Sequence, residues 1–330
     1  MRSVFIVMYH YVRKVNYSRY PQIRGLEYKR FKKQLDYFIG HYSIIKMEDL
    51  IDAIYSDSNL PDNGLLLTFD DGYIDHFQSV YPLLKNNHLQ GSFFVPGKVI
   101  KERKVLDVNK IHFILACGNV DEILYDLNYC LDHYRGSEYS IPSNRDLYEQ
   151  YALENRFDNG KTIFIKRMLQ DVLPEKLRNM ITDNLFEKYV GISERKFAEE
   201  LYVSGEQLRC MKDGGMFIGI HGYEHYWMEH LEQKKMKEDV DKALEVLGDF
   251  IDKDAWVMNY PYGSYNNGII DYISTEGCCL GLTTEVRKAK LGIDNRYLLP
   301  RLDTNDFPPN SNNFLNYDEE TDDGKPGSAL

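Results

Sequence analysis

The chain has 330 residues, of which 43% are hydrophobic and 28% are charged, a balance typical of a globular protein with a sizeable core. Its 40 lysine and arginine residues and 51 aspartate and glutamate residues give a net charge of −11, which argues against a nucleic-acid or anionic-membrane partner. The five cysteines show no C-x-x-C spacing, so we expect reduced core residues.

The N-terminal sequence predicts a protein that is not exported. The apolar run 4–8 is too short for the core of a signal peptide, and no small-residue cleavage site follows it. No stretch approaches the roughly 20 apolar residues that a membrane-spanning helix needs. We therefore expect a soluble, cytoplasmic protein with no membrane span.

Strand and helix patterns alternate through the first hundred residues. Residues 4–8 are typical of a buried strand, and apolar residues at helical spacing follow them at Phe31, Leu35, Phe38 and Ile39. The alternation continues with predicted strands at 43–46, 64–69 and 91–95 and predicted helices at 47–55 and 74–86. Such repetition favours a parallel α/β sheet or barrel.

Residues 101–201 differ, because their apolar residues follow helical spacing with few β-branched runs, which predicts a helical insertion. The alternation then resumes, with predicted strands at 216–220, 255–259, 278–283 and 297–300 and predicted helices at 236–251 and 269–273. The barrel is assigned to residues 1–100 and 202–306. Residues 307–330 are rich in Pro, Asn, Asp and Gly and are expected to form a mobile tail.

Two predicted strands end in groups suited to metal chemistry. Asp70 and Asp71 follow one apolar strand, and His221 and His225 follow another. If the histidines begin a helical turn, residues i and i+4 lie on one face and both imidazoles can reach one metal ion. Each pattern alone is also compatible with a polar turn or with two packed histidines.

Two further predicted strands end in Tyr260-Pro261-Tyr262-Gly263 and in Arg301. Taken separately, these are an ordinary turn and a surface ion-pair partner. Taken together, the four strand ends supply carboxylates, imidazoles, a backbone amide and a guanidinium. Functional side chains gather at the C-terminal edge of the strands in a parallel α/β barrel, so the coincidence favours a single active site.

The order Thr68-Phe69-Asp70-Asp71-Gly72, His221-x-x-x-His225 and Tyr260-Pro261-Tyr262-Gly263 resembles the polysaccharide deacetylases of carbohydrate esterase family 4, the NodB-homology group. The resemblance covers residues 1–100 and 204–306, including the opening Met8-Tyr9-His10-Tyr11-Val12. It implies a distorted (β/α) barrel of the NodB-homology type with a helical insertion near the strand ends. Members with such a block resemble enzymes of bacterial surface-polysaccharide gene clusters.

By this resemblance, Asp71, His221 and His225 hold one divalent metal ion, expected to be zinc, and leave positions open for water and substrate. Asp70 is the general base. The backbone N–H of Tyr262 helps to hold the oxyanion, and Arg301 keeps Asp70 ionised.

Two departures from the family pattern concern the arginine and the proton donor. Asn259 stands where the third motif of the family has arginine, so that role passes to Arg301. No histidine follows His230, although the family uses a late histidine to protonate the leaving amine. His10 is the first substitute and His112, at the start of the insertion, is the second; each is equally compatible with a packed or surface histidine.

The resemblance implies metal-dependent hydrolysis of an N-acyl group, expected to be N-acetyl, on an amino sugar. Without an export signal, the predicted substrate is a cytoplasmic nucleotide- or lipid-linked precursor of a surface polysaccharide such as an O-antigen, enclosed by the insertion. Two alternatives stay open: an N-deformylase of a small amino sugar, and a catalytically impaired carbohydrate-binding protein of the same fold. The sequence predicts no oligomeric state.

Overall fold

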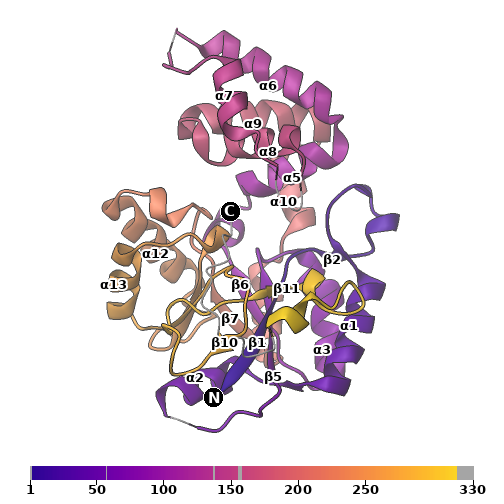
Figure 1. Cartoon of the computed structure of the whole chain (residues 1–330), viewed down its shortest axis with the longest axis vertical. Helices are drawn as coiled ribbons and strands as arrows, with labels where there is room; N and C mark the ends of the chain where they lie inside the picture. Colours follow the sequence, from indigo (N-terminus) through magenta and orange to yellow (C-terminus); the bar gives the residue numbers. More distant parts are fainter. Residues whose placement is uncertain (1, 57, 137, 155–157, 318–330) are drawn as a thin grey trace. The chain divides into compact units, whose positions relative to one another are not determined.

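The computed structural model describes residues 2–56, 58–136, 138–154 and 158–317 and divides into two compact units (Figure 1). The first unit holds the described residues up to Lys14, from Gly25 to Lys104 and from Ala198 onward. The second holds Val15–Arg24 and Val105–Phe197. Residues 15–24, which the sequence pattern placed with the barrel, thus belong to the helical unit.

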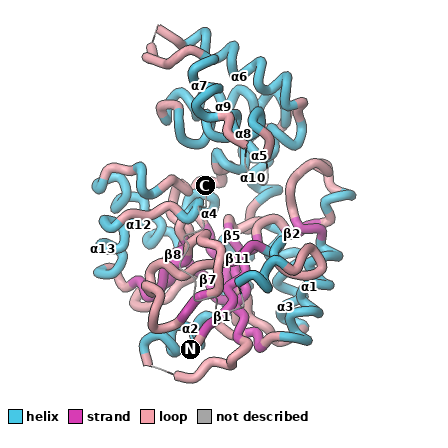
Figure 2. The backbone as a smooth tube through the Cα atoms, in the orientation of Figure 1, coloured by secondary structure: helices cyan, strands magenta, loops and turns pink. Residues whose placement is uncertain are grey.

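The first unit is built on a mostly parallel sheet that has nine strands within the described part of the chain (Figure 2). The strand order is β10-β1-β5-β6-β7-β8-β9, with β11 added to β1 and β4 added to β5, and only the β1–β10 pair is antiparallel. The strands are β1 (Ser3–Tyr9), β4 (Ser43–Ile44), β5 (Gly64–Asp70), β6 (Ser92–Val95), β7 (Phe217–Ile220), β8 (Trp256–Asn259), β9 (Cys278–Leu282), β10 (Ala289–Lys290) and β11 (Leu302–Asp303). A separate parallel pair joins β2 (Val12–Arg13) to β3 (Leu26–Glu27).

Helices surround this sheet, and in the view of Figure 1 α12 and α13 lie to its left and α1 and α3 to its right. The helices are α1 (Tyr28–His41), α2 (Met47–Tyr55), α3 (Tyr81–Asn86), α4 (Gly97–Lys101), α11 (Gly205–Asp213), α12 (Gln233–Leu247) and α13 (Asn267–Thr275). Helix α10 (Glu194–Leu201) contains the boundary between the units. Short helical turns are η2 (His76–Val80), η4 (Met228–His230), η5 (Pro261–Gly263), η6 (Thr304–Asp306) and η7 (Asn313–Tyr317).

Several sequence-based element predictions need correction. Ile39 was placed on the buried face of its helix but is 46% exposed, because it is rotated by about 100° from the buried Phe38. The helix predicted at 74–86 is confirmed, although its middle, His76–Val80, is a π-helical turn, η2, that leads directly into α3. The strand predicted at 297–300 is absent: Leu299 makes an isolated bridge to Leu282, and the strand β11 begins after Arg301.

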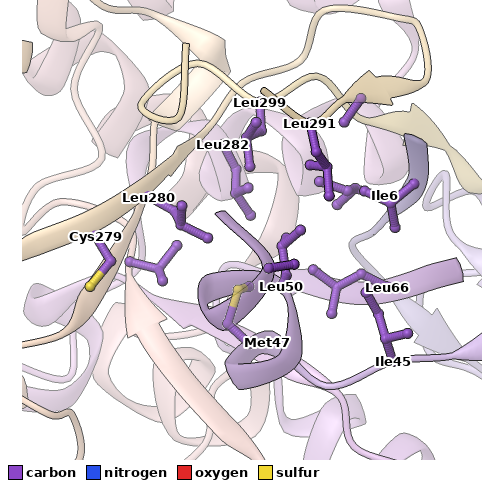
Figure 3. Packing of buried hydrophobic residues seen from close by; sticks show 14 of the residues in the cluster. Ile6, Ile45, Met47, Leu50, Leu66, Cys279, Leu280, Leu282, Leu291 and Leu299 are labelled. Atoms are coloured by element: carbon purple, nitrogen blue, oxygen red, sulfur yellow. The ribbon is translucent and has the colours of Figure 1, made fainter. Parts of the chain in front are cut away.

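A hydrophobic core lies between the sheet and α2. In Figure 3, Ile6 and Leu66 of the central strands and Leu280 of β9 surround Met47 and Leu50 of the helix. Because helices cover the parallel sheet, all seven residues of β5 are buried, including the acidic residue at its end. A carboxylate in such a place needs hydrogen bonds or a counter-charge to offset its desolvation.

Residues 307–317 pack onto the first unit, although the sequence pattern placed them in a mobile tail. Phe307 and Phe314 are buried and make edge contacts with the ring of Phe5. The side-chain amide of Gln34 donates to the carbonyls of Thr304 and Phe307. Aromatic burial and this buried amide therefore hold the segment, and the rest of the predicted tail, 318–330, lies outside the described residues.

The second unit is helical, as its apolar spacing predicted. It contains η1 (Val15–Tyr17), α5 (Asp107–Cys117), α6 (Val120–Tyr134), α7 (Asn144–Tyr151), α8 (Gly160–Arg167), η3 (Met168–Val172) and α9 (Glu175–Val190). Ile123, Leu127 and Leu131 form the buried stripe of α6. His112 lies on α5. In the described part of both units, no helix combines the length and the apolar character needed to cross a membrane.

Candidate active site

The ends of neighbouring strands bring most of the predicted site residues together at one edge of the sheet. β1 and β5 are parallel and adjacent, so His10 and Asp70 lie side by side where these strands end. β7 and β8 are also parallel neighbours, which places His221 next to Asn259. Arg301 precedes β11, which pairs with β1. The register of the sheet therefore joins residues that are far apart in sequence.

Asp71, His221 and His225 form a buried cluster at this edge. The Oδ1 atom of Asp71 lies 3.4 Å from Nε2 of His221 and 3.3 Å from Nε2 of His225. The two imidazole centroids are 4.7 Å apart. One ligand atom from each residue lies within 4.8 Å of the others, which is close enough for all three to bind one metal ion.

The protonation of this cluster fits a bound cation. Nδ1 of His221 lies 2.7 Å from the backbone carbonyl of Asn259, so Nδ1 carries the proton and Nε2 of the neutral ring keeps its lone pair. Burial alone would raise the pKa of Asp71, but contacts with His221 and His225 hold that pKa well below its ordinary value. One carboxylate oxygen and one nitrogen of each imidazole thus converge on a single point, a donor set that would accept a divalent ion.

The unpaired atoms of the cluster agree with this interpretation. Among the described residues, Oδ1 of Asp71 is buried and accepts no hydrogen bond. The other oxygen, Oδ2, accepts from the hydroxyl of Tyr73 at 2.5 Å. Burial raises the pKa of Tyr73, so its hydroxyl stays protonated and can donate. One carboxylate oxygen is therefore oriented by Tyr73 while the other is left for a metal ion.

The two histidines converge through a loop and not through the helical turn considered as one way to bring them together. Gly222 and His225 have φ values of +67° and +64°, in the left-handed region. Asp71 and Tyr262 share this feature, with φ values of +73° and +58°. Backbone strain at non-glycine residues thus gathers at the site, as is common where function requires a particular geometry.

Asp70 lies in a separate network beside the cluster. Arg301 binds it through two parallel contacts of 2.9 Å, from Nη1 to Oδ1 and from Nη2 to Oδ2. The side chain of Asn259 donates to Oδ1 of Asp70 at 2.7 Å and accepts from Nη2 of Arg301 at 2.8 Å. The remaining donors of Arg301 reach Thr68 and the carbonyl of Thr283, so all five of its N–H groups are used.

This network keeps Asp70 ionised inside the protein. Burial would raise the pKa of Asp70, but the charge of Arg301 lowers it below its ordinary value. Arg301 is itself almost completely buried and is held by hydrogen bonds at every nitrogen. The arrangement suits a carboxylate that must carry a negative charge at neutral pH.

His10 lies next to Asp70, with its Nε2 atom 3.8 Å from Oδ2, too far for a hydrogen bond. Its side chain is 42% exposed, in contrast to the buried residues around it. The backbone carbonyl of His10 accepts from Nε2 of the buried His76 at 2.9 Å. His10 therefore combines a held backbone with a ring that has room to move. The other proton-donor candidate, His112, belongs to the second unit.

Tyr262 contacts the metal-binding cluster through its ring. The ring packs edge-on against His225 at 4.7 Å and stacks in parallel on Trp227 at 4.3 Å. The structure thus places Tyr262 beside His225, as the motif order suggested.

Sequence reasoning missed two contributors to the site, Tyr73 and the side chain of Asn259. Tyr73 directly follows the Asp70-Asp71-Gly72 turn, and this adjacency was the available signal. Asn259 was treated only as a departure from a family pattern, whereas its amide bridges Asp70 and Arg301.

A family model described as "Polysaccharide deacetylase" matches residues 57–113 and 177–278. These stretches contain both adjacent aspartates and both histidines of the site, and the gap between them falls within the helical unit. The chain belongs to the polysaccharide deacetylase family. The family implies a carbohydrate substrate, and the buried Asp71–His221–His225 cluster of this chain is consistent with one divalent ion.

YxkH of Bacillus subtilis (strain 168), a protein named for the same family, is 29% identical to this chain over 96 residues. The matched region is 29% of this chain and 32% of YxkH, so the chain matches about a third of the length of that relative.

Two solved structures resemble this chain along nearly its whole length. One is the Streptococcus pyogenes deacetylase PplD in complex with acetate, with a TM-score of 0.59 and 15% identity over 96% of this chain and 98% of PplD. The other is a de-N-acetylase from Aggregatibacter actinomycetemcomitans, with a TM-score of 0.56 and 18% identity over 95% of this chain and 100% of that one. These likenesses show the fold, a strongly curled half-barrel, and confirm the predicted fold class.

Proposed function

We propose that this protein is a metal-dependent hydrolase that removes the N-acetyl group from an amino sugar. The proposal rests on one observation: two adjacent buried carboxylates have different interaction partners. Asp71 faces two imidazoles, whereas Asp70 is bound by a guanidinium and an amide. One strand end thereby offers a metal ligand and a separate ionised base, the pair that amide hydrolysis needs at neutral pH.

Asp71, His221 and His225 would hold the ion, for which we propose zinc because one carboxylate and two imidazoles form a donor set that zinc accepts. Bound there, a divalent ion polarises the substrate carbonyl and lowers the pKa of water. With three protein ligands, the site keeps positions open for both.

Asp70 would take the proton of the attacking water, and the hydrogen bonds point to its Oδ2 atom. Oδ1 already accepts from Arg301 and Asn259, whereas Oδ2 accepts, among the described residues, from Arg301 alone. A carboxylate oxygen offers about two acceptor positions, so Oδ2 retains one for a proton. Arg301 would keep the carboxylate ionised before the attack.

His10 would donate a proton to the nitrogen of the leaving amine as the C–N bond breaks, which releases acetate and the free amino sugar. Its Nε2 atom faces the same Oδ2 of Asp70 at 3.8 Å, and its exposed ring can approach a substrate. The backbone N–H of Tyr262 would help to stabilise the oxyanion, at a position where the left-handed backbone is supported by ring stacking on Trp227.

The substrate that we propose is the one expected from the sequence. It is an N-acetylated sugar linked to a nucleotide or to a lipid, deacetylated in the cytoplasm before a surface polysaccharide is assembled. The family relationship supports the carbohydrate, and the assay below decides the carrier and the acyl group.

The test measures acetate released by protein that is stripped with a chelator and reloaded with zinc, cobalt or manganese. The substrates are a nucleotide-linked N-acetylamino sugar, a lipid-linked one, a chitin oligomer and an N-formyl analogue. We expect metal-dependent acetate release from a carrier-linked sugar.

Each other outcome of this assay has a clear meaning. Faster release of formate than of acetate favours the N-deformylase alternative. Release from chitin alone overturns the precursor proposal. Saturable sugar binding with no product at any metal loading overturns the hydrolase and favours a binding protein.

A further inference from the structure

The peptide between His221 and His225 has no regular secondary structure, so its backbone polar groups need partners from elsewhere. Two elements supply them. The backbone N–H groups of Gly97 and Lys98, at the start of α4, donate to the carbonyls of Gly222 and Tyr223 at 3.0 and 3.1 Å. These contacts satisfy the carbonyls of Gly222 and Tyr223, and the N–H groups of the loop need partners from the second element.

A single buried carboxylate on α12 satisfies those N–H groups. Oδ2 of Asp239 accepts from the backbone N–H of Tyr223 at 2.8 Å, and Oδ1 accepts from that of Glu224 at 2.9 Å. Asp239 is 4% exposed. Both of its oxygens are therefore committed to the loop, and each of the two N–H donors has a charged acceptor of its own.

The loop sequence is adapted to this close approach. Gly222 has a φ of +67°, and a Cβ atom there would lie 2.9 Å from Oδ2 of Asp239 and 2.9 Å from the terminal methyl of Met228. Any larger residue would strain the backbone and displace the carboxylate. The absence of a side chain at Gly222 thus makes room for the carboxylate of Asp239.

Burial of the Asp239 carboxylate by itself opposes folding, which suggests that the residue serves a purpose other than stability. Burial raises its pKa to about 6, and the two backbone hydrogen bonds only partly oppose that rise. A buried carboxylate of this kind costs free energy unless its hydrogen bonds are made. The groups that benefit are those of the loop with both histidines.

We propose that Asp239 is a positioning residue of the metal centre, which holds the backbone between His221 and His225 so that both imidazoles reach the ion bound by Asp71. The inference rests on the proposed function, because it requires a metal ion at this cluster. Asp239 touches neither the ion nor the substrate and acts through the two N–H groups.

The test is an Asp239→Asn variant, in which one acceptor oxygen becomes an NH₂ group that faces a backbone N–H. We expect the zinc affinity of the folded protein to fall by about 10- to 100-fold, as for other residues that orient metal ligands. The absorption spectrum of the cobalt-loaded protein should also change, because it reports the ligand geometry. A residue that only supports folding would lower the unfolding temperature of the metal-free protein and leave affinity and spectrum unchanged.

Asp241→Asn is the matched control, since Asp241 lies on the same helix, is exposed and bonds Tyr272. We expect its zinc affinity to equal that of the wild type. Gly222→Ala disturbs the same contact on the loop, so it should also weaken zinc binding. The combination of Gly222→Ala with Asp239→Asn should cost less than the sum of the single effects.

The outcomes separate this inference from the function on which it rests. Wild-type zinc affinity and an unchanged cobalt spectrum in Asp239→Asn, with His221→Ala unable to bind, overturn the inference and leave the metal site standing. A wild-type protein that binds no divalent ion overturns both. If Asp239→Asn does not fold, the Gly222→Ala variant decides, and wild-type affinity in that variant overturns the inference.

Discussion

Asp70 and Asp71 are neighbours in sequence, both buried and both ionised, yet their surroundings are opposite in kind. Asp70 meets hydrogen-bond donors, from Arg301 and Asn259. Asp71 meets the ring nitrogens of two histidines and has one oxygen without a donor among the described residues. The carboxylate of Asp70 is thus suited to accept a proton, and that of Asp71 is suited to bind a cation. The residues around each carboxylate cause this difference.

Removal of a metal ligand should have the largest effect. We expect His221→Ala to lose bound zinc almost completely and to lower kcat/KM by on the order of 1000-fold or more, since the Lewis acid goes with the ligand. Metal content by elemental analysis and acetate release measure the two losses. If His221→Ala binds one equivalent of metal, the assignment of the metal site to Asp71, His221 and His225 is wrong.

Neutralisation of the base should come next. We expect Asp70→Asn to lower kcat by roughly 100- to 10,000-fold, the usual contribution of a general base, while zinc stays bound. The comparison of metal content with turnover separates this variant from His221→Ala, and circular dichroism checks that both are folded. Substantial activity in Asp70→Asn would show that the base lies elsewhere.

Loss of the Asn259 side chain should have an intermediate effect. In Asn259→Ala one N–H of Arg301 and one acceptor position of Asp70 lose their partner, a cost of about 1–3 kcal/mol, or roughly 5- to 150-fold in kcat/KM. Metal binding should persist, because His221 bonds to the backbone carbonyl of residue 259, which the substitution retains. Equal losses of metal and activity would contradict the separation of the two networks.

The smallest effect should concern stability and not catalysis. Burial lowers the pKa of His76 from 6.5 to about 4. Between these values the unfolded chain binds more protons than the folded one, so stability is fully present above pH 6.5 and is lost as the pH falls toward 4, by up to roughly 3 kcal/mol.

Denaturant unfolding of the metal-free protein from pH 7 to 4 measures this loss. His76→Asn should flatten that part of the curve, because the substitution removes the titrating imidazole. Exposed His88 offers the control, since His88→Asn should leave the curve unchanged. If His76→Asn keeps the full wild-type slope, His76 is not the group that titrates.

The sequence by itself determined the alternation of elements, the helical segment and the two acidic and two histidine residues of the site. These are local properties: apolar spacing reports which face of a helix or strand is buried, and a polar cluster after an apolar strand marks its end. The same logic failed for Ile39 and for residues 307–317, where tertiary contacts override local pattern.

Only the tertiary structure decided which partners each site residue has. Arg301 reaches Asp70 across 231 residues of sequence, and Asn259 joins them across 189 and 42. No local pattern encodes these distances, because the order and register of parallel strands set them. The left-handed turns that bring His225 beside His221, and Tyr262 beside His225, are likewise imposed by the surrounding contacts, since isolated residues of these types rarely adopt that backbone.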